Sequence, residues 1–467
     1  MNTSFNPAAA VAVPHPPVII PEVGQGREKE IRATDEAYRE AAAFVAAADP
    51  DTLVVISPHS VMYSDYMHIS PGVTASGSLR RFGAGNVKLT VRYDAELVGE
   101  ICAVCADKGV SAGTEGERDS SLDHGTMIPL YYLNEAFRGK LPPVIRVGLS
   151  GLPLAEHYRL GMAIKAAADN LGRKIAVIAS GDLSHRLKED GPYGFDPRGP
   201  EYDSRVMAVL GSGDFGGLFG FGERLCRDAG ECGHRSFVIM AGALDGYAVE
   251  AKKLSYEGPM GVGYGVCVFS PTSADGSRRF LGTEEDRRRK ELLDRREKED
   301  EYVRLARGSL EKYVSEGRLM RIPDGLSEEL MSRRAGAFVS IHKNGSLRGC
   351  IGTIYPVCLS LAQEIIDNAV SAGTRDPRFP PIKKDELPEL EYSVDVLGDP
   401  EDIDGPSQLD VRRYGVIVTQ GYHRGLLLPN LEGVDTVEDQ IRIARQKAGI
   451  KEGEEIKLQR FEVTRHF

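Results

Sequence analysis

The sequence lacks the features that mark membrane proteins, secreted proteins and dedicated nucleic-acid binders. No apolar stretch approaches the roughly 18 residues that a membrane span requires. The segment Met1–Val13 has no basic region before its short Ala/Val run, so we expect no signal peptide. The net charge of −11 argues against a nucleic-acid partner, because phosphate binding needs a basic surface.

Cysteine is also scarce, with 7 residues in a chain of 467. A small, odd number of cysteines without a signal peptide is typical of free thiols in a reducing compartment. We therefore expect a cytoplasmic protein that is not held together by disulfides.

Residues 1–270 alternate short β-branched runs with helical stretches, which predicts an α/β fold of layered type around a mixed sheet. The expected strands are Ala10–Val13, Leu53–Ser57, Val87–Tyr93, Val144–Leu149, Ile175–Ser180 and Val262–Phe269. The expected helices are Arg27–Ala48, Ala95–Lys108, Thr126–Phe137, Leu154–Asn170, Arg205–Gly211 and Phe237–Val249.

The composition changes after residue 270. Residues 284–301 are almost wholly charged, with opposite signs spaced by four residues, which predicts a solvated helix. We expect a charged linker and helix start over residues 271–294. A second, smaller α+β domain is expected over residues 295–467.

Histidines gather at equivalent places in the first domain. His15, His59 and His185 each follow an expected strand, and His124 stands just before an expected helix. Open α/β sheets place their sites at the carboxyl ends of strands. A single histidine in such a loop is more often structural, but four in the same topological place predict a common site.

The segment Gly230–His234 offers further ligands at the start of a helix, namely Glu231, Cys232 and His234. Two histidines and one carboxylate make up the facial triad of non-haem iron(II) sites. An acidic residue at a helix start is equally consistent with a simple electrostatic role there. Spacing alone leaves both interpretations open.

These motifs, in this order, resemble the LigB-type family of class III extradiol ring-cleaving dioxygenases and the related Memo family. The residues that carry the likeness are Pro-His-Pro-Pro around His15, Ser-Pro-His around His59, Asp-His-Gly around His124, and Gly-Asp-Leu-Ser-His ending at His185. The resemblance implies that His15, His59 and Glu231 bind iron(II). It also implies that His185 and His124 transfer protons while an aromatic diol or related ring reacts with O2.

The segment at Glu231 departs from the dioxygenase pattern, because Memo-like relatives carry Cys-Gly where the dioxygenases carry Glu. This chain has Glu231 and Cys232 side by side, so the third ligand is Glu231, Cys232 or His234. A thiolate ligand would favour copper or zinc over iron. The alternative function is therefore a Memo-like metal-binding redox or scaffold protein that does not open rings.

A glycine-rich loop marks the second domain. In Leu-Arg-Gly-Cys-Ile-Gly-Thr, Cys350 could be a nucleophile whose pKa is lowered by Arg348, or a small buried residue beside an arginine that pins the loop. The motif resembles the AMMECR family, as do Thr374–Phe379, Gly425–Pro429 and Lys447–Gly449. The likeness suggests a site around Arg348, Cys350, Asp376 and Arg378, which could also be a fixed ionic network.

The whole chain thus resembles two proteins joined together. Similar Memo-like and AMMECR-like proteins occur in bacteria with a radical S-adenosylmethionine protein, which implies such a partner, and relatives suggest a homodimer. A covalent link raises effective concentration, so we expect both domains to serve one substrate or pathway. A third possibility places the chemistry at Cys350, with the first domain accessory.

Overall fold

The computed structural model describes residues 6–343, 345–431 and 433–467. The chain divides into two compact units, Met1–Asp286 and Arg287–Phe467. Among the residues described, no helix combines the length and the apolarity that crossing a membrane requires.

A six-stranded mixed sheet organises the first unit, in the order β7-β2-β8-β1-β10-β9. The first four strands of that order are parallel. Strand β10 is antiparallel to β1, and β9 is antiparallel to β10. The strands are β1 (Ala9–Val13), β2 (Thr52–Ile56), β7 (Val144–Val147), β8 (Ile175–Ser180), β9 (Tyr247–Glu257) and β10 (Tyr264–Ala274).

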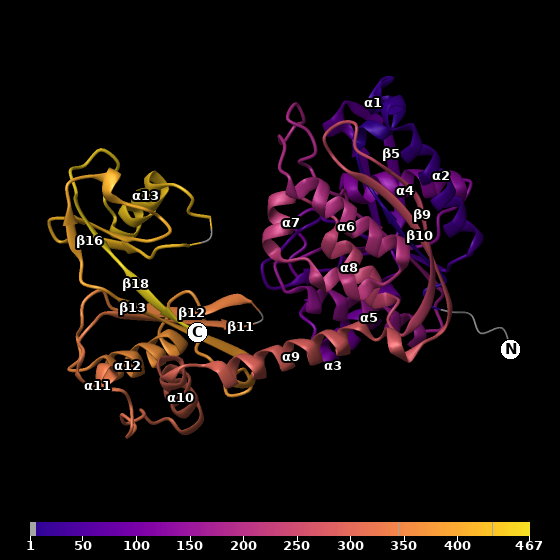
Figure 1. Cartoon of the computed structure of the whole chain (residues 1–467). Coiled ribbons are helices and arrows are strands. Elements are labelled where there is room, and N and C mark those ends of the chain that lie inside the picture. The colour runs from indigo at the N-terminus through magenta and orange to yellow at the C-terminus, as the bar shows by residue number, and fades with distance from the viewer. Residues whose placement is uncertain (1–5, 344, 432) are drawn as a thin grey trace. The chain divides into compact units, whose positions relative to one another are not determined.

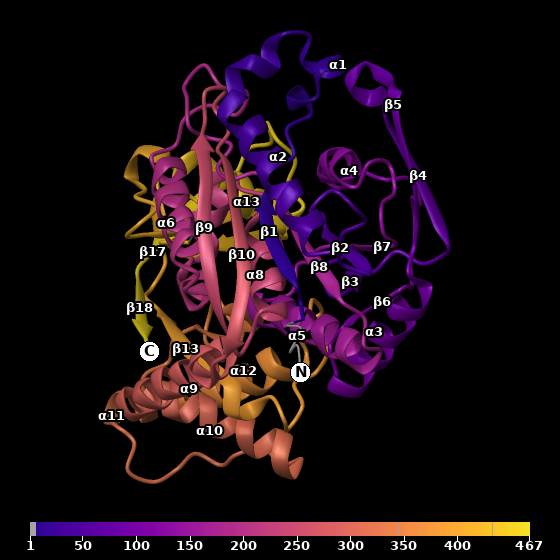
Figure 2. The same cartoon turned by 90° about the vertical axis from the view of Figure 1, so that its right-hand side faces the viewer.

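Successive side chains of these strands point to opposite faces of the sheet. They therefore pack into two separate hydrophobic cores, one on each face. Ala10, Val54 and Val177 pack in one core, while Val11, Val55 and Ile178 pack in the other. Helix α2 lies along one face beside β1 and β10, and α8 lies against β8 on the other (Figure 2). Because both faces are covered, β1, β2 and β8 are buried along their whole length.

The remaining elements of the first unit surround this sheet. The helices are α1 (Pro21–Gly24), α2 (Arg32–Ala47), α3 (Ala95–Lys108), α4 (His124–Ala136), α5 (Leu154–Asn170), α6 (Arg198–Ser212), α7 (Glu223–Ala229) and α8 (His234–Ala243). The short strands are β3 (Met67–His68), β4 (Thr74–Leu79), β5 (Ala84–Arg92) and β6 (Ala112–Gly113). The 3₁₀ turns are η1 (Pro17–Ile19), η2 (Arg27–Ile31), η3 (Arg80–Phe82), η4 (Phe215–Gly220) and η5 (Gly276–Arg278).

The second unit contains two four-stranded sheets, in the orders β12-β11-β13-β18 and β14-β17-β15-β16. Their strands are β11 (Ala337–Lys343), β12 (Ser346–Gly352), β13 (Leu390–Leu397), β14 (Glu401–Ile403), β15 (Gly415–Gln420), β16 (His423–Leu427), β17 (Lys457–Phe461) and β18 (Val463–His466). Helix α9 (Phe280–Lys298) begins in the first unit and ends in the second. The other helices are α10 (Glu301–Glu316), α11 (Glu328–Ser332), α12 (Leu361–Thr374) and α13 (Val437–Ala448). The 3₁₀ turns are η6 (Leu387–Glu389) and η7 (Pro406–Gln408).

The predicted α/β class, with a layered mixed sheet followed by a smaller α+β part, is confirmed. Several local predictions differ from the structure, and two of the differences have a clear cause. The strand expected at Val87–Tyr93 exists as part of β5, but it pairs with β4 in a separate hairpin. The helix expected over Phe237–Val249 ends at Ala243, because a turn at Gly246 with φ of 77° starts strand β9.

Helices α5 and α8 approach each other through glycines, and this contact places the start of α8. A Cβ atom on Gly161 would lie 2.0 Å from the carbonyl oxygen of Ile239, and one on Gly242 would lie 2.1 Å from that of Tyr158. Neither carbonyl can move without breaking a helix, so both positions require glycine. The contact therefore fixes helix α8, which begins at His234 just after Cys232.

We expect Gly161→Ala to destabilise the protein by about 3 kcal/mol, although alanine is the better helix former, because the added methyl group must separate two packed helices. Gly99→Ala is the matched control: Gly99 is exposed in α3 and has no atom within 4 Å of its added Cβ. It should raise stability by about 0.5–1 kcal/mol. Urea titration followed by circular dichroism measures both, and equal effects would contradict this account.

Candidate metal centre

The carboxyl ends of three adjacent parallel strands meet at one edge of the first sheet. His15 follows β1, His59 follows β2 and His185 follows β8, and these strands lie side by side in the order β2-β8-β1. Helix α4 begins at His124 at the same edge. The structure thus brings together the four histidines that the sequence singles out.

Three of these histidines form a cluster that could hold a metal ion. One ring nitrogen from each of His15, His59 and His124 lies within 4.8 Å of the other two. The Nε2 atoms of His15 and His59 are 2.9 Å apart, and the rings of His59 and His124 stack with centroids 4.1 Å apart. Two ring nitrogens at this separation either share a proton or face a common cation.

The proton position on His15 is fixed by a short hydrogen-bond chain. The Ser180 hydroxyl donates to the Gly125 carbonyl oxygen at 2.6 Å, so its single proton is already used. Ser180 must therefore accept the hydrogen bond of 2.9 Å from Nδ1 of His15. The Nε2 lone pair of His15 is left directed at the cluster, which is the tautomer that a metal ligand needs.

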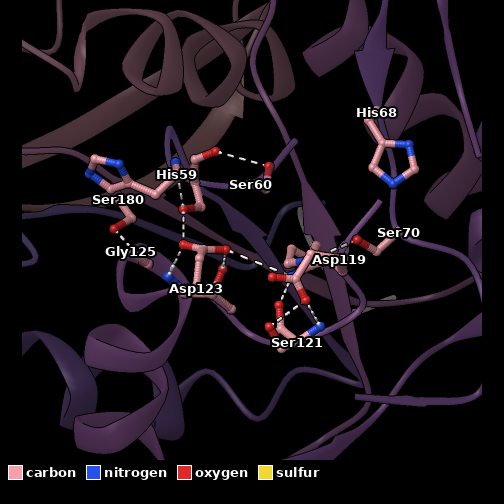
Figure 3. A network of polar contacts seen from close by, with 12 residues as sticks. His59, Ser60, His68, Ser70, Asp119, Ser121, Asp123, Gly125 and Ser180 are labelled. Atoms are coloured by element: carbon pink, nitrogen blue, oxygen red, sulfur yellow. Dashed lines mark hydrogen bonds and ion pairs between the residues drawn. The ribbon is translucent and has the colours of Figure 1, made fainter. Parts of the chain in front are cut away.

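His124 is held by the loop that precedes it. The Asp123 carboxylate accepts hydrogen bonds from the Thr126 backbone at 3.0 Å and the Ser57 hydroxyl at 2.5 Å, which caps α4 and ties it to the loop of His59 (Figure 3). Arg146, only 2 % exposed on β7, donates to the backbone carbonyls of Asp119 and Ser121 in the same loop. The Asp123–Thr126 pair is a capping pattern that the sequence could have revealed.

Burial keeps the imidazoles neutral. It lowers the pKa of His15 well below the usual value, and the charges of His59, His124 and His185 lower it further. Burial and then the charge of His59 lower the pKa of His124 to about 4. At neutral pH these rings therefore offer lone pairs, as metal ligands do, rather than positive charge.

His185 lies next to the cluster, since its charge affects the pKa of His15. Its Nδ1 atom is buried and has no hydrogen-bond partner among the described residues. The ring of Tyr193 lies edge-on to His185 at 5.2 Å, and that of Phe82 lies edge-on to His124 at 5.2 Å. Both aromatic side chains are exposed, and nothing in the sequence pattern had connected them with the histidines.

The three alternatives for a further ligand lie in different surroundings. The Glu231 carboxylate accepts a hydrogen bond of 2.6 Å from the His234 backbone at the start of α8, and it is not part of the histidine cluster. His234 is buried, with Nε2 donating to Leu218 and Nδ1 accepting from Tyr202. Cys232 alone faces the histidines, with Sγ 3.6 Å from Nε2 of His15.

Asp182 connects the segments that carry these residues. Its Oδ1 atom accepts a hydrogen bond of 2.6 Å from the His15 backbone, and its carbonyl oxygen accepts from Gly233 at 3.1 Å. Burial raises the pKa of Asp182 to about 7. The preceding residue, Gly181, packs on Gly233, where an added Cβ would lie 2.1 Å from the Gly233 Cα atom.

In the second unit, only part of the predicted group comes together. The Cys350 backbone donates to Asp376 at 2.9 Å, and Arg378 binds Asp376 at 2.7 Å. Arg348 instead forms a two-pronged ion pair with Glu386 at 2.9 and 3.0 Å. Burial raises the pKa of Cys350, and the Arg348 guanidinium is engaged by Glu386.

Comparison with known proteins finds relatives of the whole chain and of parts of it. A protein of Clostridium acetobutylicum is 41% identical over 462 residues, covering 97% of this chain and 98% of that protein. A protein of Thermotoga maritima is 52% identical over 170 residues, covering 36% of this chain and 98% of its own length. An uncharacterized protein from Pyrococcus horikoshii, of known crystal structure, is 33% identical over 35% of this chain and 88% of its own, with a TM-score of 0.34.

Two families account for most of the sequence. Residues 303–466 match the AMMECR1 family, and residues 9–267 match the family described as the catalytic LigB subunit of aromatic ring-opening dioxygenase. The chain therefore belongs to the LigB family and carries an AMMECR1 domain after its LigB domain.

Proposed function

We propose that the first unit binds one transition-metal ion at the histidine cluster and catalyses an O2-dependent reaction of a small aromatic diol or related ring. The observation that carries the proposal is the convergence of three neutral imidazoles, with the His15 lone pair held toward the others by Ser180. Imidazole ligands suit iron, copper and zinc. Iron(II) is the ion that the family relationship favours.

The chain's own residues suit the parts of such a reaction. A bound metal would act as a template for the diol and O2 and as an electron conduit between them. A diol must lose protons to bind a metal through both oxygens, and the imidazole of His185 beside the cluster can accept one. The exposed rings of Phe82 and Tyr193 offer apolar surface to an aromatic substrate beside the cluster.

The surroundings of Glu231 and Cys232 favour a second candidate function, a metal-binding redox protein that does not open rings. The Glu231 carboxylate is engaged at the start of α8, whereas the Cys232 thiol lies beside His15. A donor set of imidazoles and a thiol differs from the two-histidine, one-carboxylate triad of ring-opening iron sites, and it suits copper or zinc.

We expect about one metal ion per chain after anaerobic purification, and loss of tenfold or more in metal affinity in His59→Ala. Glu231→Gln should keep the metal, because that carboxylate contacts backbone rather than the cluster. Cys232→Ser should reduce copper or zinc binding, with Cys226→Ser as a matched control at a half-buried cysteine outside the cluster. Elemental analysis and metal titration measure this; no metal in any preparation, even after reconstitution, would contradict the proposal.

We expect the iron(II)-loaded protein to consume O2 with at least one catechol or aminophenol in a substrate panel. His185→Gln should lower kcat by about 10²–10⁴-fold while metal content is unchanged, because a general base is lost and no ligand is removed. An oxygen electrode measures the rate. Bound metal without O2 consumption by any diol would reject ring opening and support the second candidate.

A further inference from the structure

Helix α4 carries a proline in its interior. Pro129 is buried in the second turn of this helix, which packs beside α2 and also contacts β8 in the first unit (Figure 1). Proline is the least favourable residue inside a helix, because it has no N–H group and its ring presses on the carbonyl four residues earlier. The carbonyl affected here belongs to Gly125, which directly follows His124.

The Gly125 carbonyl receives its hydrogen bond from the sheet instead of from the helix. In a regular helix the amide of residue 129 would donate to this oxygen. Pro129 has no such amide, and the hydroxyl of Ser180 at the end of β8 donates to the oxygen at 2.6 Å (Figure 3). Ser180 is fully buried, so no water competes for its proton.

This bond decides where the protons of two histidines lie. Ser180 Oγ is 2.9 Å from Nδ1 of His15, and with its own proton engaged at Gly125 it must accept there. His15 therefore carries its proton on Nδ1. Nε2 of His59 lies 2.9 Å from the remaining lone pair of His15. Because two lone pairs do not face each other at that distance, His59 carries its proton on Nε2 in the metal-free protein.

The backbone at Gly125 cannot turn to another partner. An added Cβ atom there would lie 2.5 Å from Oγ of Ser57 and 3.3 Å from Cδ2 of His59. The glycine is thus pressed against the loop that carries His59, and its carbonyl keeps its direction. The residue at position 129 then determines whether a second donor competes with Ser180 for this oxygen.

We propose that Pro129 is a positioning residue of the histidine cluster. By withholding the amide that would otherwise bind Gly125, it leaves the carbonyl to Ser180 and so holds His15 in the tautomer whose Nε2 lone pair can bind a metal. The inference rests on the cluster that the proposed function uses, but it concerns the metal-free protein.

Pro129 also lines an apolar space together with Tyr38 and Leu133. A purely structural role in that space would affect the stability of the protein, but it would not move a proton on His15. The position of that proton therefore separates the two roles.

The test is a long-range nitrogen–proton NMR correlation on the chelator-treated full chain with isotope-labelled histidine, which distinguishes protonated from unprotonated ring nitrogens. Spectra of His15→Gln and His59→Gln assign the two residues. We expect His15 to be protonated on Nδ1 and His59 on Nε2. A wild-type His15 that carries its proton on Nε2 would overturn the proposal without any variant at position 129.

Pro129→Ala supplies the missing amide, so we expect His15 to populate both tautomers and the affinity for zinc, used as the probe metal, to fall about tenfold. Ser180→Ala should do the same by removing the acceptor. Pro200→Ala is the matched control and should change neither, because Pro200 is exposed in the first turn of α6, where an amide has no partner within the helix.

A His15 that stays wholly protonated on Nδ1 in Pro129→Ala would overturn the proposal, even if Ser180→Ala shifts it. The expected tautomers and their shift in Pro129→Ala, without zinc binding in the wild type, would support this inference and contradict the proposed function.

Discussion

The candidate metal centre depends on the hydrogen bonds that Asp182 makes to two other segments. Its side chain binds the backbone of His15, and its carbonyl oxygen binds the turn at Cys232 and Gly233. Three segments distant in sequence are thereby held at the end of one sheet. Because these bonds involve backbone groups, they fix where the chain lies, and the ligand side chains only have to reach inward from it. Each bond is buried, where an unpaired backbone donor would be costly.

Much of this site could be predicted from the sequence, because parallel strands end at a common edge. His15, His59 and His185 follow recognisable apolar strands, so their proximity needed no knowledge of side-chain packing. The position of Glu231 could not be read in the same way. A carboxylate three residues before a helical backbone amide can cap that helix or bind a metal. Which of the two roles Glu231 takes depends on where α8 lies, and the packing of α8 against α5 determines this.

The same limit applies in the second unit. Arg348 and Cys350 are two residues apart, so sequence proximity suggested an interaction between them. On the strand, Arg348 reaches Glu386, 38 residues further along the chain, and the Cys350 backbone donates to Asp376, 26 residues further along. Contacts between residues far apart in the chain produce no periodic pattern in the sequence. The strands and helices that carry these residues do produce one, namely the regular spacing of their apolar residues.

The contact between Gly181 and Gly233 has a consequence for how this protein can evolve. Each glycine occupies the space that a side chain on the other would need. A substitution at one position cannot be compensated at the other, since neither residue has a side chain that could become smaller. Mutations around the histidine cluster can therefore change the exposed residues at its edge. Both glycines must be kept in any related protein in which the two turns remain in contact. Variation in what the site accepts should arise at the rim, in residues such as Phe82 and Tyr193, and the backbone frame beneath them should be inherited unchanged.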